Sequence, residues 1–198
     1  AGSVMHGTDE LDVRKLGGLR IAMPITAVLF SIGALSLAGI PVLAGFWSKD
    51  EILLAVYSNL PPIFIIFTLL TVFLSALYMA RAMFLVFFGT IGGSSGSAHE
   101  SPASMTWTMG ILGFFAVTFG FLALNLGGSL EGFGHFVFFE HAEAFHFNWW
   151  LGSISVLLAL AAFVAAYLAY FRYSPVMARI NEKLSPVLKV IENKYYLD

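Results

Sequence analysis

The sequence of 198 residues contains no cysteine, and only 11% of its residues are charged. Without cysteine the chain cannot form disulfides, carry out thiol chemistry or supply thiolates to an iron–sulfur cluster. A soluble domain of this length would carry roughly twice as many charged residues. The formal net charge of −2 lacks the basic excess typical of nucleic-acid-binding proteins. We therefore expect neither a soluble enzyme with reactive thiols nor a nucleic-acid partner.

Hydrophobic residues dominate what remains. They make up 59% of the chain, the mean hydropathy is +0.84, and there are 20 phenylalanines. The apolar runs are too long for helices in a soluble core, which predicts an all-α, polytopic membrane protein in contact with lipids. The opening residues 1–5 are typical of the end of a helix, so we expect the chain to be a fragment of a longer protein.

Four transmembrane spans are expected, in a single membrane domain that covers residues 1–198. Their approximate ranges are 22–58, 61–89, 104–127 and 148–171, and a basic amphipathic tail follows at 172–198. As one straight helix, the first range would be about 55 Å long, whereas a hydrocarbon core is about 30 Å thick. Gly39 and Pro41 provide a break, so we expect the first span to be discontinuous.

Local signals suggest where the two halves of this first span begin and end. We expect a half-helix at 23–39, unwound chain at 40–47 and a second half-helix at 48–58. The second start is suggested by Ser48 and Glu51, which have the spacing of a capping box before an apolar run.

The distribution of basic residues supports one broken span rather than two complete ones. With four spans, the basic loop at 12–20 and the basic tail lie on the same side, and the loop at 128–147, which has no Lys or Arg, lies opposite. By the positive-inside rule, both ends of the chain are then cytoplasmic. Two complete spans within 22–58 would put the basic segments on opposite sides.

Lys49 is the main candidate for a functional residue, because it lies in an apolar segment just after the break. A lysine at the centre of a bilayer costs about 2.5–3.5 kcal/mol on insertion scales, and such residues commonly mark ion pathways. We expect the positive end of the second half-helix to disfavour charge on Lys49. Asp50 is a second candidate, although adjacent helical positions point about 100° apart. The alternative is that Lys49 snorkels toward the membrane surface.

Other polar residues are secondary candidates. Glu51 belongs to the same charged cluster as Lys49, and Arg81 lies in the span 61–89, where it could pair with an acid, bind Tyr78 or snorkel. A histidine- and glutamate-rich segment matches no compact zinc pattern, and a surface segment that dips into the membrane interface explains it better. Its titratable residues are His135, Glu140, His141, Glu143 and His146. No metal site is expected.

Three stretches together resemble a known family. Asp12–Leu19 is similar to a loop motif of antiporter-like subunits, and Gly45–Leu53, preceded by Ala38–Pro41, resembles their broken helix. The closing Asn193–Asp198 is similar to the approach to a long lateral helix. The combination resembles the L-type (chain 5) subunit of proton-pumping NADH:quinone oxidoreductase, respiratory complex I.

The resemblance implies a role in proton translocation within a bacterial inner membrane. It implies that Lys49 ends a chain of buried charges along which protons cross the membrane, with Asp50 as its neighbour, and that His6 lies near a family histidine. It also implies other complex I membrane subunits as partners, especially a neighbouring antiporter-like subunit. No cofactor is expected in this chain, because NADH, FMN, iron–sulfur clusters and quinone belong to partner subunits.

Two other interpretations remain open at the level of sequence. One is a subunit of a multisubunit sodium/proton antiporter, which shares the loop motif and the broken helix; a plastid- or cyanobacterial-type oxidoreductase is a further variant. The other is a membrane scaffold without an ion path, in which Lys49 and Arg81 face lipid headgroups.

Overall fold

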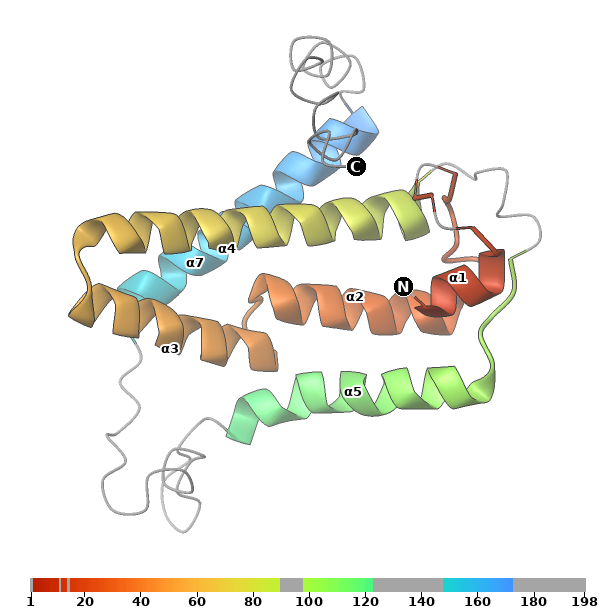
Figure 1. The fold of residues 1–198 in the computed structure, drawn as a ribbon, viewed down its shortest axis with the longest axis horizontal. Coiled ribbons are helices and arrows are strands. Elements are labelled where there is room, and N and C mark those ends of the chain that lie inside the picture. The colour runs from red at the N-terminus through yellow and green to blue at the C-terminus, as the bar shows by residue number, and fades with distance from the viewer. Residues whose placement is uncertain (1, 11, 14, 90–97, 123–147, 173–198) are drawn as a thin grey trace, which may run out of the picture.

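The computed structural model describes residues 2–10, 12–13, 15–89, 98–122 and 148–172. These residues form helices and connecting segments without a β-strand, so the all-α prediction is confirmed. In chain order the helices are α1 (Gly2–Thr8), α2 (Pro24–Ala38), α3 (Ala44–Asn59), α4 (Pro62–Met83), α5 (Ala103–Leu122) and α7 (Trp149–Tyr167) (Figure 1). Two of them continue as π-helical turns, α4 into η1 (Phe84–Phe88) and α7 into η3 (Leu168–Arg172).

Within the described residues, three helices are long and apolar enough to cross a membrane, which makes the chain a multi-pass membrane protein. They cover Pro62–Phe88, Ala103–Gly120 and Trp149–Tyr170. The first and last of these helices lie within the ranges expected for the second and fourth spans, and the middle one begins one residue before the range expected for the third. Residues 123–127 of that third range are outside the described part of the chain. The helix α2 is also apolar but has only 15 residues, about 22 Å, which is too short for a complete crossing.

The helices α2 and α3 run in the same general direction, and α4 returns alongside both of them (Figure 1). Both short helices also contact α5. The structure therefore contains the interrupted helix that the sequence predicts.

Alanines allow α4 and α7 to pack closely. Ala76 of α4, Ala159 and Ala162 of α7, and Ala38 at the end of α2 form one buried cluster. Small side chains let helix backbones approach, which is the main way that helices associate in a membrane. This cluster fixes the end of α2 against α4 and α7.

A polar junction joins the beginning of α2 to α1 and to the segment before α5. Ser3 of α1 hydrogen-bonds to Thr26 of α2 over 3.0 Å and also to Ser101. The loop after α1 is tied to η1 by a hydrogen bond from the Leu19 amide to the Val86 carbonyl. These contacts hold one end of the bundle together, while the opposite end of α2 is left to form the break.

Candidate functional site

The break between α2 and α3 covers residues 39–43. Gly39 ends α2 in the left-handed conformation, with φ at +79°, and its amide donates to the Ser36 carbonyl. The Ile40 amide donates to the Leu35 carbonyl, which completes a Schellman motif. Val42 also has a positive φ, +80°, which is strained for a β-branched residue. The prediction that Gly39 and Pro41 interrupt the helix is correct.

The predicted start of the second half-helix is wrong. The unwound chain ends at Leu43 rather than at residue 47, α3 begins at Ala44, and Ser48 does not cap it. Instead, the Ser48 hydroxyl donates to the Gly45 carbonyl inside the helix. The reason is a contact between the half-helices: the Gly45 amide donates to the Ser36 hydroxyl over 3.2 Å, so α2 supplies the acceptor that the capping box was expected to provide.

Gly45 is needed for this contact. A Cβ atom at this position would lie 2.0 Å from the Ser36 carbonyl oxygen. The last turn of α2 and the first turn of α3 therefore overlap side by side with backbone nearly in contact, and any larger residue would separate them.

Lys49 spans the break. Its Nζ donates a 2.8 Å hydrogen bond to the carbonyl oxygen of Ala38, the last residue of α2. The last carbonyl groups of a helix have no partner within the helix and carry the negative end of its dipole, so they attract a cation. Gly39 leaves room for the side chain, because a Cβ atom there would lie 2.8 Å from Lys49 Cδ and 3.1 Å from Nζ.

This geometry corrects the expected effect of the helix dipole. Lys49 lies in the second turn of α3, beyond the first turn in which the positive end acts, and its ammonium contacts the negative end of α2 instead. The side chain is partly buried and directed to the break rather than extended toward the end of α3.

Asp50 and Glu51 lie on different faces of α3. Asp50 shares the buried face with Phe46 and Leu53 and is only 2% exposed, whereas Glu51 is exposed. Asp50 Oδ1 has no hydrogen-bond partner among the described residues, and no ion pair joins Asp50 to Lys49 there. Burying an unpaired carboxyl oxygen costs free energy, so Asp50 is a position at which an additional proton or donor group would have a large effect.

Glu100, which no local sequence pattern marks, caps the other end of α2. Its carboxylate accepts hydrogen bonds from the Ile25 amide over 2.9 Å and from the Thr26 hydroxyl over 2.6 Å. Partial burial by itself raises the pKa of Glu100, but the hydrogen bonds from Thr26, Ser101 and Ile25 outweigh it, so the pKa is lower than the ordinary 4.5. The sequence offers one indirect sign of such a partner. The helix begins at Pro24 without a local capping side chain, so its first amides need an acceptor from elsewhere.

A groove between α2 and α5 runs from the beginning of α2 to the break. It has a volume of about 420 Å³, with Ser3 and Thr26 at one end and Ser36 and Gly45 at the break. Apolar residues of α2 and α5, such as Leu29 and Met109, line the part between. The arrangement places a polar group at each end of an apolar passage along α2.

The remaining candidates lie elsewhere. Arg81 is exposed and its guanidinium lies 5.7 Å from the centre of the Tyr170 ring; the described residues contain no hydrogen bond from it to Tyr78. His6 is exposed, and its ring packs against His99 at 6.1 Å rather than approaching Lys49. Among the described residues, Lys49 therefore contacts the break through Ala38, its chain neighbours Asp50 and Glu51 lie on other faces of α3, and Arg81 and His6 lie elsewhere.

The histidine- and glutamate-rich segment falls between α5 and α7. His135, Glu140, His141, Glu143 and His146 lie outside the described residues. In the parts of the chain that the structure describes, no three metal-binding side chains come together.

Comparison with known proteins agrees with the family resemblance of the sequence. The family model described as "NADH:quinone oxidoreductase/Mrp antiporter, TM" matches residues 1–75, which include the break and Lys49. The chain is 36% identical, over its whole length, to NAD(P)H-quinone oxidoreductase chain 5 of a Picosynechococcus species, of which it covers 35%. It therefore spans about a third of the length of such relatives.

Two further relatives come from other organisms. The chain is 33% identical to F(420)H(2) dehydrogenase subunit L of Methanosarcina mazei, with 99% of the chain and 33% of the relative aligned. It is also 33% identical to NADH-quinone oxidoreductase subunit L of Neisseria meningitidis, with 100% of the chain and 35% of the relative aligned. The interrupted helix, the apolar helices and these similarities agree, and the chain belongs to the antiporter-like family of NADH:quinone oxidoreductase membrane subunits, of the L or chain 5 type.

Proposed function

We propose that this chain is part of a proton-translocating subunit of an NADH:quinone oxidoreductase and carries the distal part of its proton channel. The observation that carries the proposal is the position of Lys49 at the break, with its ammonium on the carbonyl of Ala38. Interrupted helices are a common way to build an ion site within a membrane protein. The relatives are named as subunits of oxidoreductases, which supports assignment to such a complex.

In this proposal Lys49 binds and releases the transported proton. A neutral carbonyl holds the ammonium, and no carboxylate compensates it among the described residues, so a charge that moves elsewhere in the complex changes the stability of the protonated form. Asp50, which is buried beside Lys49 with an unpaired oxygen, is proposed to exchange protons with groups on other helices. Glu51 and His6, both of which are exposed, are proposed as secondary residues.

The proposed setting follows the same family. We place the chain in a bacterial inner membrane with four crossings, the first formed by α2 and α3 together, and with both ends cytoplasmic. Its partners are other membrane subunits of the complex, especially an adjacent antiporter-like subunit, and the redox cofactors belong to partner subunits. The relatives are named for NAD(P)H, F(420)H(2) and NADH, so this chain does not determine the electron donor.

The description of the matching family also names the Mrp antiporter, which keeps sodium/proton antiport as a second candidate. Oxidoreductase relatives over the entire chain favour the first candidate. A pure scaffold would require Lys49 to be dispensable.

The test is Lys49→Met in the full-length subunit of the assembled complex, reconstituted into vesicles. A positioned proton-transfer group typically contributes at least about 100-fold to rate, so we expect proton flow through this module to be nearly abolished while the complex still assembles. Lys15→Met is the matched control, because Lys15 is exposed and pairs with Glu10 over 3.1 Å in a loop. The proton-to-electron ratio is measured in sodium-free and sodium-containing buffer.

Three outcomes are informative. Loss of proton transport by Lys49→Met in both buffers, with Lys15→Met unchanged, supports the proposal. Transport that requires sodium points to the antiporter function, and an unchanged proton-to-electron ratio in Lys49→Met would favour the scaffold.

A further inference from the structure

We propose that the groove between α4 and α7 binds one anionic phospholipid, with its phosphate on Arg81 and an acyl chain along the apolar part of the groove. This inference does not depend on the proton-channel proposal, since the residues that line the groove do not include Lys49 or Asp50.

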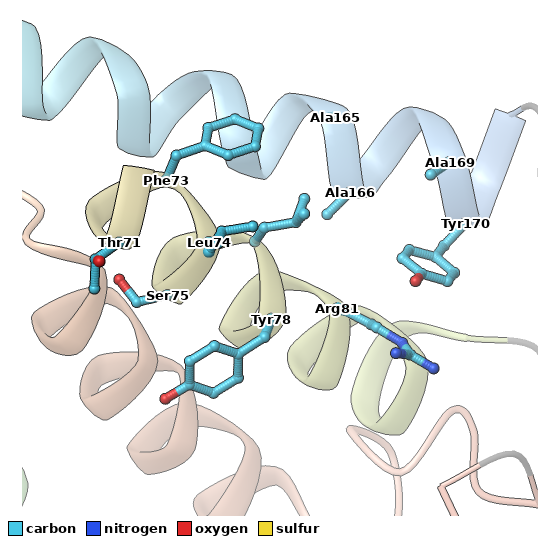
Figure 2. Close-up of a pocket in the computed structure, with 11 residues that line it drawn as sticks. Thr71, Phe73, Leu74, Ser75, Tyr78, Arg81, Ala165, Ala166, Ala169 and Tyr170 are labelled. Atoms are coloured by element: carbon cyan, nitrogen blue, oxygen red, sulfur yellow. The ribbon is translucent and has the colours of Figure 1, made fainter. Parts of the chain in front are cut away.

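The shape of the groove suits one acyl chain. Its volume is about 750 Å³, and it lies along one side of the α4–α7 contact (Figure 2). Leu74 and Leu77 form part of the α4 wall, and the small side chains of Ala165 and Ala169 form part of the α7 wall. From Thr71 to Arg81 the groove follows α4 for about 15 Å.

The charge lies at one end of the groove. Figure 2 shows Arg81 and the ring of Tyr170 together at this end, and the guanidinium is 5.7 Å from the ring centre. Within the described residues, no carboxylate lies within ion-pair distance of Arg81. A guanidinium presents several donors in a planar arrangement that suits a phosphate, and stacking on an aromatic ring leaves its edge available for such contacts.

The position of Arg81 along the helix suits a lipid headgroup. Arg81 lies about 10 Å before Phe88, where η1 ends, so its long side chain can reach the interface. A second cation lies at the same end, because the Arg20 guanidinium is 5.3 Å from the centre of the Phe88 ring. Basic pockets between transmembrane helices are typical binding sites for anionic headgroups.

These observations together match the two parts of a phospholipid. The cation is at the end of the helices, and the apolar groove extends from it toward their middle. A zwitterionic lipid would fill the groove but would gain less from Arg81, so the proposal predicts selectivity for anionic lipid.

The experiment uses the complete complex, purified and depleted of lipid. Phosphatidylglycerol or phosphatidylcholine is added, and bound lipid is counted by native mass spectrometry of the released subunit. We expect wild type to retain phosphatidylglycerol selectively and Arg81→Gln to bind it about tenfold more weakly. Lys15→Gln is the matched control, because Lys15 is an exposed cation that pairs with Glu10 and does not line the groove. Its binding should stay close to wild type.

A second variant protects the test against a failure of Arg81→Gln to assemble. Ala165→Phe fills the groove while Arg81 is kept, and it should also weaken phosphatidylglycerol binding. Equal binding by wild type and both variants would overturn the proposal. So would a map of the complex in which a carboxylate of another protein segment, rather than a phosphate, contacts Arg81.

Discussion

Lys49 of α3 donates its hydrogen bond to the backbone carbonyl of Ala38, the last residue of α2. The two residues are on opposite sides of the break, so the side chain connects the half-helices. At the other end of α2, Glu100 accepts from the first amides. Thus α2 has a carboxylate at its positive end and an ammonium at its negative end, and both stabilise it through its dipole.

Gly39→Ala should disturb the lysine without removing it. A non-glycine residue in the left-handed conformation costs about 1–2 kcal/mol, and the new Cβ atom would lie 2.8 Å from Lys49 Cδ. We expect the complex to be less thermostable and proton transport to fall, though less than in Lys49→Met. Thermal unfolding and the proton-to-electron ratio measure the two effects.

The control for this substitution is Gly33→Ala. Gly33 lies within α2, and a Cβ atom there would meet nothing within 4 Å, so alanine should leave stability unchanged or raise it by about 0.5–1 kcal/mol. Equal transport by Gly39→Ala and Gly33→Ala would show that the space beside the lysine is not important.

Gly120→Ala should push α5 away from the break. A Cβ atom at Gly120 would lie 2.8 Å from the Val42 carbonyl oxygen and 3.0 Å from the Trp47 ring, so backbone must move. Overpacking of this kind typically costs about 1–3 kcal/mol. Gly110→Ala, in the same helix but in open space, is the matched control. Thermal unfolding of the two variants should differ by this amount, and identical melting temperatures would contradict the close packing of α5 on the break.

Glu100→Gln should weaken the start of α2 in a pH-dependent way. The carboxylate at the N-terminus of a helix contributes about 0.3–1 kcal/mol, and Gln keeps an acceptor but loses the charge. Because the pKa of Glu100 is lowered by folding, its contribution is complete above the ordinary value of 4.5 and is lost as the pH falls through the lower folded value.

The difference in melting temperature between wild type and Glu100→Gln should therefore be present at pH 7 and shrink below pH 4.5. Glu10→Gln serves as the comparison, since Glu10 forms an ion pair with the exposed Lys15, and such pairs contribute little. A pH-independent difference for Glu100→Gln would mean that the carboxylate acts through shape alone.

Local signals predicted the helices and the position of the break well. Gly39 and Pro41 act on their own backbone, so their effect is visible in the sequence. The start of α3 was predicted too late because it depends on Ser36, which reaches Gly45 only after the half-helices overlap. A capping box is a local pattern and cannot reveal a partner supplied by another helix.

The functional residues were predicted to different extents. A lysine in an apolar segment is conspicuous, so Lys49 could be found, but its acceptor could not, because a backbone carbonyl leaves no mark in the sequence. Glu100 was missed because its partners, Ile25 and Thr26, are distant in the chain. Its side chain acts across the interface between two segments, and only their packing reveals it.

The acceptor for Lys49 belongs to the backbone, which limits how mutation can change it. Every amino acid at position 38 carries the same carbonyl, so replacing Ala38 cannot delete the acceptor and can alter it only by moving the end of α2. A random mutagenesis screen for lost proton transport should therefore yield changes at the lysine and at the tightly packed glycines around it, and few at position 38 other than those that disrupt helix packing.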